Sequence, residues 1–424
     1  MRDHSKHIEL DREDAVATIL ARCAFAPAIE TVALEESYGR TLACDEVSAV
    51  TLPNCLTCNM DSVALHWSDF ENGMPDISGW KRGEQWQFAN TGVGMPEGFD
   101  TAIAIENARV SADDQTLEEI VLAPSRQHAG TSPAGSRIKA GDLIAKAGTV
   151  VTPLVAAALA AGGLTQAHVL AKPRVAFIPT GNELVQMGET IGRGMNIESN
   201  SVLMRGKILA WGGEPVIFPI VRDKPDLIEA ALRKACAECD IVVLNAGSSK
   251  GSDDWAMEIL DRIGEVFNHE TSHGPGHHSS YAMVEGTPIV GISGPSLGAA
   301  FTSDFYLKPL IQLWYGHATE PEKIRVRLAQ DFPAGGPGAK PKGDGPKADA
   351  PKPGGEARPA FVRDRPFYAI QHLKLAQGED GVFEATPIRF RPNLTEADGS
   401  QAYYPLNKDA APAAGDIIEV ELRG

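Results

Sequence analysis

Three short stretches of the sequence hold side chains whose types and spacing could do chemistry. The first, NAGSSKGSDDW at 245–255, follows an apolar run and contains two glycines. Glycines let a backbone approach a ligand closely, and a helix that begins near Ser252 or Asp253 would offer free N–H groups to a phosphate. The P-loop pattern is absent. The stretch indicates an anion site, and an ordinary capped turn between strand and helix fits it equally well.

The second stretch, IPTGNELV at 178–185, is an apolar strand that runs into Thr180, Gly181 and then Glu183. Ligands of open α/β sheets bind where the strands end. Glu183 could therefore hold a metal or accept a hydrogen bond from a substrate. A surface acid in a turn is the alternative interpretation.

The third stretch carries the histidines His269, His273, His277 and His278. Imidazoles suit zinc, nickel or iron. The first three are spaced by four residues, as on one helix face, but Gly-Pro-Gly at 274–276 breaks a helix there. The cluster predicts either a metal site or a hydrogen-bonding wall for an anion.

Two C-x-x-C pairs, Cys55 with Cys58 and Cys236 with Cys239, add a further hypothesis. A zinc site with four thiolates requires all four sulfurs at about 2.3 Å from one ion. A zinc-binding or redox function therefore stays open. Met60 and Asp61 directly follow the first pair and place a carboxylate there as well.

Composition narrows the classes of partner. The chain has 424 residues, of which 43% are hydrophobic, and a formal net charge of −17. This length predicts two to four domains, at about 100–200 residues each. The negative charge argues against nucleic acid and anionic membranes as partners, although a small anion can still bind at a helix N-terminus.

The sequence predicts a cytoplasmic protein without a membrane span. The longest apolar run, near 153–164, is shorter than the ~20 residues that a spanning helix needs. The charged N-terminus lacks the apolar core of a signal peptide. Six cysteines in a chain of this length do not form a disulfide scaffold, which favours a reducing compartment.

The elements that must position these residues fall into several regions. Apolar spacing predicts helices over 8–40 and 153–162, and short alternating segments such as 62–66 and 101–105 predict a β-rich insert. We expect a helical linker region at 1–45 and 139–170, and the insert at 46–138.

From 171 to 318 apolar strands alternate with helices. The strands are expected at 174–180, 215–221, 240–247 and 287–293, and the helices at 200–211, 224–239, 253–263 and 297–314. This alternation predicts a parallel sheet covered on both faces. Residues 319–424 are expected to form a small C-terminal β domain, whose Pro/Gly-rich stretch 332–359 is expected to be disordered.

Taken in order, several stretches resemble the MoeA/gephyrin-E family, which inserts molybdate into adenylylated molybdopterin. The family pattern P-x-x-x-S-x-M-D-G-Y-A resembles residues 53–64, and S-T-G-D-E-L resembles PTGNELV at 179–185. Further similar stretches are Thr91-Gly92, Pro96-Glu97-Gly98 with Asp100 and Glu106, Ile197 to Asn200, GSSKGSDDW at 247–255, Gly274-Pro275-Gly276 and ISGPSLGAAFT at 292–302.

The resemblance implies a multidomain α/β protein with a three-layer molybdopterin-binding-like domain, a β-rich insert, an elongated helical linker region and a small C-terminal β domain. It implies Asp61, Glu183 and Asp254 as catalytic residues, with Asp61 and Asp254 holding molybdate or magnesium. The cofactor-binding residues that it implies are Thr180, Gly181, Gly247, Ser248, Ser249, Gly251, Gly276, His277 and Gly294.

The resemblance also implies partners. Family members form homodimers in which the insert of one subunit faces the α/β domain of the other, so Asp61 would act across the interface. A molybdopterin-adenylating protein or a molybdoenzyme would be the protein partner.

Several family positions differ here. Ser132, Ser136 and Arg137 stand where the family has Arg, Glu and Asp, and Asn182 replaces an Asp. Gly274 and His277 replace two lysines, and the P-G-N-P turn reads Ser-Gly-Pro-Ser at 293–296. Three functions therefore stay open: a molybdenum transferase with intact or altered turnover, a non-catalytic molybdopterin-binding paralogue or molybdoenzyme chaperone, and the zinc or redox protein.

Overall fold

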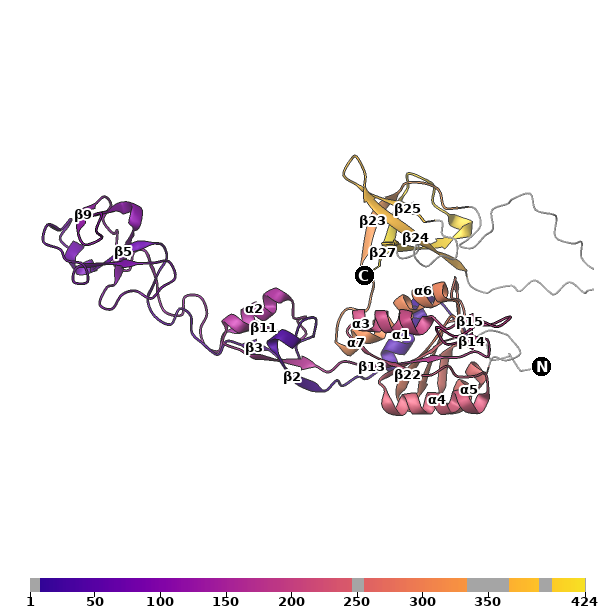
Figure 1. Ribbon diagram of the computed structural model, residues 1–424. Helices are drawn as coiled ribbons and strands as arrows, with labels where there is room; N and C mark the ends of the chain where they lie inside the picture. The colour runs from indigo at the N-terminus through magenta and orange to yellow at the C-terminus, as the bar shows by residue number, and fades with distance from the viewer. Residues whose placement is uncertain (1–7, 246–254, 334–365, 389–398, 424) are drawn as a thin grey trace, which may run out of the picture. The chain divides into compact units, whose positions relative to one another are not determined.

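The computed structural model describes residues 8–245, 255–333, 366–388 and 399–423 (Figure 1). The chain divides into two compact units, one of Met1–Pro27 with Lys172–Gly424 and one of Ala28–Ala171. The four sequence-derived domains are finer than this division, and their boundaries stay a prediction. Among the described residues, no helix is long and apolar enough to cross a membrane.

A six-stranded sheet organises the larger unit. Its strands lie in the order β16 (Glu214–Ile217), β13 (Arg174–Pro179), β17 (Ile241–Asn245), β22 (Thr287–Ile292), β21 (Ser280–Val284) and β18 (Glu265–Asn268). The first four are parallel, as the apolar runs predict, and the last two are antiparallel. The four strands predicted from the sequence are thus parallel, and the sheet continues at one edge with two further strands that were not predicted. There Glu285 and Gly286, both with positive φ, make a two-residue hairpin turn between β21 and β22.

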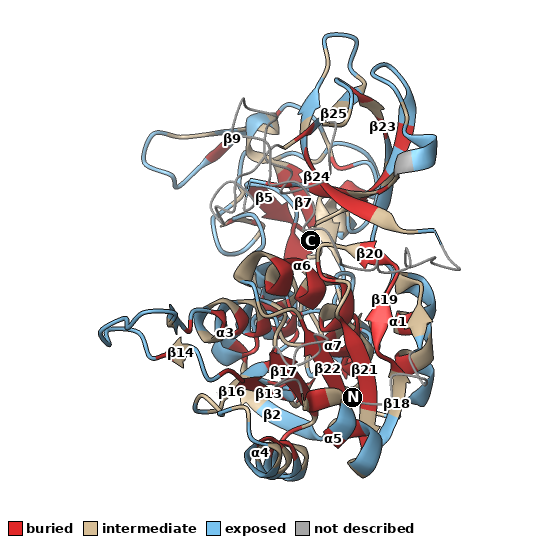
Figure 2. Ribbon diagram, turned by 90° about the vertical axis from the view of Figure 1, so that its right-hand side faces the viewer, coloured by how far each residue is buried: buried red, intermediate tan, exposed pale blue. Residues whose placement is uncertain are grey.

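Helices cover both faces of this sheet, which gives three layers (Figure 1). The helices α4 (Pro225–Glu238) and α5 (Ala256–Ile263) share one core with alternate side chains of β13 and β17. The opposite face is covered by α1 (Arg12–Arg22), α3 (Asn200–Ala210), α6 (Ser296–Tyr306) and α7 (Lys308–Trp314). Both faces of the central strands are therefore buried, and Figure 2 shows β17, β22 and β21 as buried ribbons.

Two predicted helices end earlier than expected. The helix predicted at 297–314 is divided at Leu307, because Pro309 cannot donate the backbone hydrogen bond that a continuous helix needs there. The helix predicted at 8–40 covers only α1, and β2 (Ile29–Ala33) pairs with β12 (Gln166–Leu170) instead. Pro27 and the β-branched residues that follow it favour this extended segment.

The smaller unit contains the predicted β-rich insert. In it, β5 (Ser62–Leu65) pairs with β6 (Trp86–Ala89) and β7 (Thr101–Ala104), which confirms the strands predicted near 62–66 and 101–105. β8 (Ala108–Val110) pairs with β9 (Leu117–Ile120), and β4 (Thr57–Cys58) pairs with β10 (Thr131–Ser132). The rest of this unit holds α2 (Pro153–Ala161), predicted at 153–162, and the pair β3 (Glu46–Val47) and β11 (Leu143–Ala145).

The C-terminal domain is a small closed β-barrel. Its strands β24 (Tyr368–Gln377), β25 (Phe383–Pro387), β23 (Lys323–Leu328), β27 (Ile417–Leu422) and β26 (Ala402–Asn407) pair in this order, and β26 pairs again with β24. β20 (His273–Gly274) joins the barrel beside β24. From residue 334 onward, the stretch predicted to be disordered at 332–359 lies outside the described residues.

The core between α4 and the sheet allows a direct test of this packing. Leu232 is fully buried in α4, so Leu232→Ala should lower the free energy of unfolding by about 2–5 kcal/mol. Leu227 lies on the same helix with 47% of its surface exposed, so Leu227→Ala should cost less than about 0.5 kcal/mol. Urea unfolding followed by circular dichroism measures both. Equal losses in the two variants would contradict the assigned face of α4.

Candidate functional site

The C-terminal ends of three parallel strands meet at one edge of the larger unit. β13 ends before Thr180 and Gly181, β17 ends at Asn245, and β22 ends before Ser293 and Gly294. The loops that follow parallel strands lie at the same edge, where ligands of open α/β sheets bind. The structure therefore brings the predicted residues Thr180, Gly181 and Gly294 together.

A buried pair of asparagines connects these strand ends. Asn200 Nδ2 donates to Asn245 Oδ1 at 2.7 Å and to the Gly294 carbonyl at 2.8 Å. Asn245 Nδ2 in turn donates to the Ser293 carbonyl at 2.8 Å. The Thr180 hydroxyl donates to the Asn245 carbonyl at 3.0 Å. Within the described part of the chain, Asn200 Oδ1 is buried without a hydrogen-bond partner. One strong acceptor is thus held ready at this edge.

Two helix N-termini meet beside this pair. α3 begins at Asn200 and α6 at Ser296, and the hydroxyls of Ser199 and Ser296 lie 3.2 Å apart. The first N–H groups of a helix have no acceptor within the helix, and its dipole places about half a positive charge at this end. Two such ends pointing to one place favour an oxyanion such as phosphate or molybdate.

The turn that carries Glu183 is held by two side chains of the next loop. Arg222 donates from Nη1 to the carbonyls of Gly181, Asn182 and Leu184 at 3.2, 3.0 and 3.0 Å. Asp223 Oδ2 accepts from the Asn182 backbone N–H at 2.8 Å. A Cβ at position 181 would lie 2.6 Å from Glu183 Oε2, so the Glu183 carboxylate lies over Gly181. The structure thus places Glu183 beside the strand-end edge, and its catalytic role stays a prediction.

Gly276 and His277 reach the same edge from another direction. Ser280 pairs with Gly291 near the end of β22, so the residues just before Ser280 lie close to that end. Gly276 has φ +92, and a Cβ there would lie 2.3 Å from Thr302 Cγ2 in α6. Only glycine fits this close approach.

The histidines do not share a helix face. His269 precedes β19 (Glu270–Thr271), His273 lies in β20, and His277 and His278 follow β20, so their environments differ. His273 is buried and its Nε2 lies 2.6 Å from the Tyr306 hydroxyl; burial lowers the pKa of His273 to about 3. This ring is therefore neutral at physiological pH and packs in the core, whereas His277 and His278 are partly exposed.

Asp61 belongs to the other unit and sits in an exposed turn of the insert. Its Oδ1 accepts from the backbone N–H of Thr91 at 3.0 Å and from the Thr91 hydroxyl at 3.1 Å. These two hydrogen bonds lower the pKa of Asp61. Gly92 donates its N–H to the Cys58 carbonyl at 2.8 Å, so the Cys58–Asp61 and Thr91–Gly92 stretches meet here. Among the described residues, Asp61 is not part of a group of three close metal ligands.

Several predicted residues lie outside the described residues. These are Gly247, Ser248, Ser249, Gly251 and Asp254, in the loop between β17 and α5. Their predicted roles stay predictions. The described flank of this loop is Asn245, which the asparagine pair fixes at the edge.

The cysteines give no support to a zinc or redox centre. Burial raises the pKa of Cys236 to about 11, which disfavours the thiolate that metal binding and redox chemistry need. Cys58 is buried with its Sγ 3.3 Å from Met95 Sδ, whereas Cys55 is exposed. The two C-x-x-C pairs belong to different units, and all six cysteines are free thiols.

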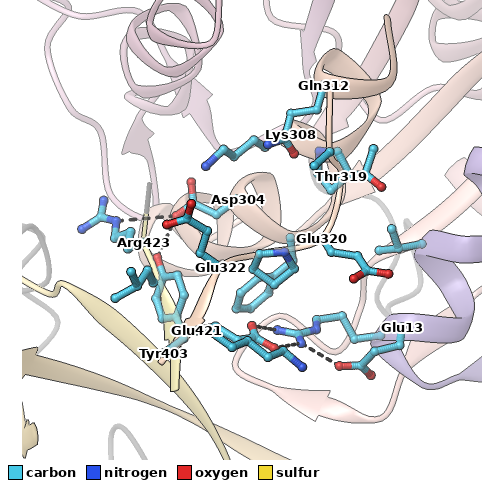
Figure 3. A pocket seen from close by; sticks show the side chains of 18 of the residues that line it. Glu13, Asp304, Lys308, Gln312, Thr319, Glu320, Glu322, Tyr403, Glu421 and Arg423 are labelled. Atoms are coloured by element: carbon cyan, nitrogen blue, oxygen red, sulfur yellow. Dashed lines mark hydrogen bonds and ion pairs between the residues drawn. The ribbon is translucent and has the colours of Figure 1, made fainter. Parts of the chain in front are cut away.

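A separate cavity of about 940 Å³ lies between α1, α7 and the barrel (Figure 3). Charged side chains line it, but they pair with one another: Arg12 with Glu421, and Arg423 with Asp304. Tyr403 also donates its hydroxyl to Asp304 at 2.7 Å. None of the predicted site residues that the structure describes lines this cavity, so it is distinct from the strand-end edge.

Comparison with known proteins assigns the family. Residues 10–163 match the MoeA N-terminal region (domain I and II), and residues 176–312 match a family described as a probable molybdopterin binding domain. The chain belongs to the MoeA family. The resemblance drawn from the sequence motifs is thereby confirmed.

Relatives and solved structures agree with this assignment. A molybdopterin molybdenumtransferase of Staphylococcus aureus (strain COL) is 28% identical over 346 residues, which cover 77% of this MoeA-family chain and 81% of the relative. A protein of the same name from Staphylococcus epidermidis is 26% identical over 318 residues, covering 70% and 75%. The molybdopterin biosynthesis MoeA protein of Pyrococcus horikoshii OT3 shares the fold, with a TM-score of 0.71 at 21% identity, covering 98% and 100%.

One functional candidate of this MoeA-family chain was missed in the sequence. Asn245 ends the buried strand β17, where its side chain joins the strand ends together. The signal in the sequence was the polar Asn245 at the end of the otherwise apolar run Ile241–Leu244. Ser199 and Asn200 were recognised only as part of a family motif, without a role.

The hydrogen bonds to Asp61 lead to a pH prediction. Thr91→Val removes the hydroxyl and keeps the shape, so the pKa of Asp61 should rise toward its ordinary value of about 3.9. The interaction favours the ionised carboxylate and is lost as pH falls through the lowered pKa. Carbon-13 NMR titration of labelled aspartates measures it. Thr131→Val is the matched control, because Thr131 donates to the His128 carbonyl instead. An unchanged pKa of Asp61 in Thr91→Val would contradict the assignment.

Proposed function

We propose that this chain binds molybdopterin at the strand-end edge of its α/β domain and inserts molybdate into it, as a step of molybdenum cofactor biosynthesis. The observation that carries the proposal is the meeting of the α3 and α6 N-termini beside the buried Asn200 acceptor. Relatives that align over most of the chain carry the name molybdopterin molybdenumtransferase.

Each part of this edge suits one part of the ligand. The two helix N-termini can neutralise a phosphate or molybdate oxyanion. Asn200 Oδ1 can accept a hydrogen bond from an N–H of the pterin ring. This bond would give the buried oxygen the partner that it lacks among the described residues. The local backbone N–H groups explain how a chain of net charge −17 can bind an anion.

The finer features of the substrate are part of the proposal. Adenylylated molybdopterin carries an additional phosphate, and magnesium is typically bound by one or two carboxylates together with substrate phosphates. Asp61 fits this requirement as an exposed, ionised oxygen ligand, and Asp254 would be the second. Magnesium would neutralise phosphate charge, while Glu183 would orient the reacting group.

Asp61 and the strand-end edge belong to different compact units. We therefore propose a homodimer in which Asp61 of one subunit completes the site of the other. The protein partner would be a molybdopterin-adenylating protein that supplies the substrate or a molybdoenzyme that accepts the product, and the compartment would be the cytoplasm.

One observation favours the alternative of a non-catalytic molybdopterin-binding paralogue or molybdoenzyme chaperone. Asn182 stands where the family has Asp, and its side chain is used structurally: Oδ1 accepts from the Asp223 N–H at 3.2 Å. The Asn182 N–H returns a hydrogen bond to Asp223 Oδ2. An Asp at 182 would place two carboxylates in this pair. Asn182 avoids that second negative charge beside Asp223.

Anaerobic binding followed by a single-turnover assay separates these functions. Molybdopterin, in free and adenylylated form, is titrated into the full chain, and molybdate insertion is then measured with and without magnesium. Binding with turnover supports the transferase, and binding without turnover supports the paralogue. If neither form binds at high micromolar concentration, the proposed function is wrong.

The Asn200 acceptor gives the sharpest binding prediction. Asn200→Ala should weaken molybdopterin binding at least about tenfold, because it removes the acceptor and unpairs Asn245, a loss of about 1.4 kcal/mol or more. Val202→Ala is the control, because Val202 lies on α3 with 54% of its surface exposed and should bind normally. Isothermal titration measures affinity, and thermal unfolding confirms that both variants fold. Unchanged affinity in folded Asn200→Ala would contradict the site.

The role of Asp61 predicts complementation between subunits. Asp61→Asn should still bind molybdopterin but insert molybdate at least about a hundredfold more slowly. Mixing Asp61→Asn with Asn200→Ala subunits should restore about a quarter of the parent rate, because half of the dimers are mixed and each of these has one intact site. Sedimentation verifies the dimer. A monomeric chain, or mixed dimers without recovery, would contradict action across the interface.

A further inference from the structure

Glu270, His277 and His278 form a cluster of which only His277 is also among the predicted cofactor-binding residues. Glu270 lies in β19, and both histidines follow the Gly-Pro-Gly segment between β20 and β21. One ligand atom from each of the three lies within 4.8 Å of the others. His278 Nδ1 is 3.2 Å from Glu270 Oε1, and the two imidazole rings have centroids 3.7 Å apart.

The carboxylate of this group is buried and the imidazoles are not. The Glu270 side chain has 5% of its surface exposed, against 29% for His278. Hydrogen bonds, a cation or a metal ion can offset the lost hydration of a buried carboxylate, and a metal ion adds a full opposite charge. The partly exposed imidazoles leave a path by which an ion from solvent can reach it.

Neighbouring residues fix the segment in place. Asn268 is fully buried, and its Nδ2 donates to the carbonyls of Glu270 and Ser279 at 3.3 and 2.9 Å. Its Oδ1 accepts from the Tyr281 N–H at 3.1 Å. Thr271 donates its N–H to the His277 carbonyl at 2.8 Å. These hydrogen bonds join residues 268–271 to residues 277–281. The backbone that carries the three side chains is therefore held in place before a ligand arrives.

Distances and charge decide between a plain ion pair and a metal site. Two ligands on a tetrahedral zinc ion, each about 2.0–2.1 Å from it, lie about 3.3 Å apart, close to the observed Glu270–His278 separation. A simple ion pair or hydrogen bond would join Glu270 to His278 alone, and it would not involve His277, whose ring centroid lies 3.7 Å from that of His278. A metal ion instead uses both rings in their neutral form together with the carboxylate.

We propose that Glu270, His277 and His278 form a binding site for a divalent transition-metal ion of the zinc class. Two imidazoles and one carboxylate are the ligand set of open zinc sites, in which water or an anion takes the fourth position. The site lies in the segment that reaches the strand-end edge through Gly276. It does not depend on the proposed function, because it binds the ion in the absence of molybdopterin.

In a second group, Cys44, Glu46 and His168, one ligand atom from each residue also lies within 4.8 Å of the others, so experiment must separate it from the first group. There Glu46 Oε1 already accepts from the His168 backbone N–H at 2.8 Å and lies 3.0 Å from His168 Nδ1. Burial raises the pKa of the Cys44 thiol. These contacts account for that group as a hydrogen-bonded cluster.

The test titrates Co²⁺ and then Zn²⁺ into the chelator-treated full chain. Visible cobalt absorption, zinc displacement and thermal unfolding should show one ion per chain and a stabilised fold. Glu270→Gln and His278→Gln should each weaken the affinity at least about tenfold and abolish the thermal shift. Cys44→Ser and His168→Gln are the matched controls and should bind as the parent does.

Two results would overturn the metal site. One is the absence of saturable Co²⁺ or Zn²⁺ binding by the parent at submillimolar concentration. The other is binding that survives Glu270→Gln and His278→Gln but disappears in Cys44→Ser. If Glu270→Gln does not fold, His278→Gln decides alone, because its side chain is more exposed and its loss disturbs the core less.

Discussion

The hydrogen bonds that Asn200 and Asn245 make with each other and with the carbonyls of Ser293 and Gly294 are the interactions on which the proposed α/β site depends. They join the start of α3 to the end of β17, and through Ser293 and Gly294 they include the turn that precedes α6. Both side chains are buried, so water cannot replace a lost partner without cost. The same network aligns two helix N-termini and leaves one amide oxygen turned to the edge.

This arrangement explains how the chain could bind the anion that we propose although it differs from its family at charged positions. The attraction for an oxyanion comes from backbone N–H groups and helix dipoles, which any side chain at these positions leaves in place. Asn182 shows the complementary effect. Its side-chain oxygen accepts from the Asp223 N–H, and its backbone N–H donates to Asp223 Oδ2, so the turn is held without a second carboxylate beside Asp223.

The histidine-containing segment shows how one stretch of sequence serves two purposes. His273 faces the core and is neutral beside Tyr306, whereas His277 and His278 face a buried carboxylate near the surface. The Gly-Pro-Gly at 274–276 separates these environments, because it ends β20 and lets Gly276 lie against α6. The proposed molybdopterin site and the proposed metal site can therefore be neighbours that share only the side chain of His277.

The sequence by itself determined the alternation of apolar strands and helices, because buried parallel strands need continuous apolar runs. It also determined the family, through motifs such as PTGNELV. It could not determine that β21 runs antiparallel to both of its neighbours, β22 and β18, because the tight turn at Glu285 and Gly286 reverses the chain there. Nor could the sequence show that Asn245 accepts a hydrogen bond from Asn200, which lies 45 residues earlier in the chain. Only the tertiary structure decided which polar residues share one edge, because that depends on strand order and on the packing of α3 and α6.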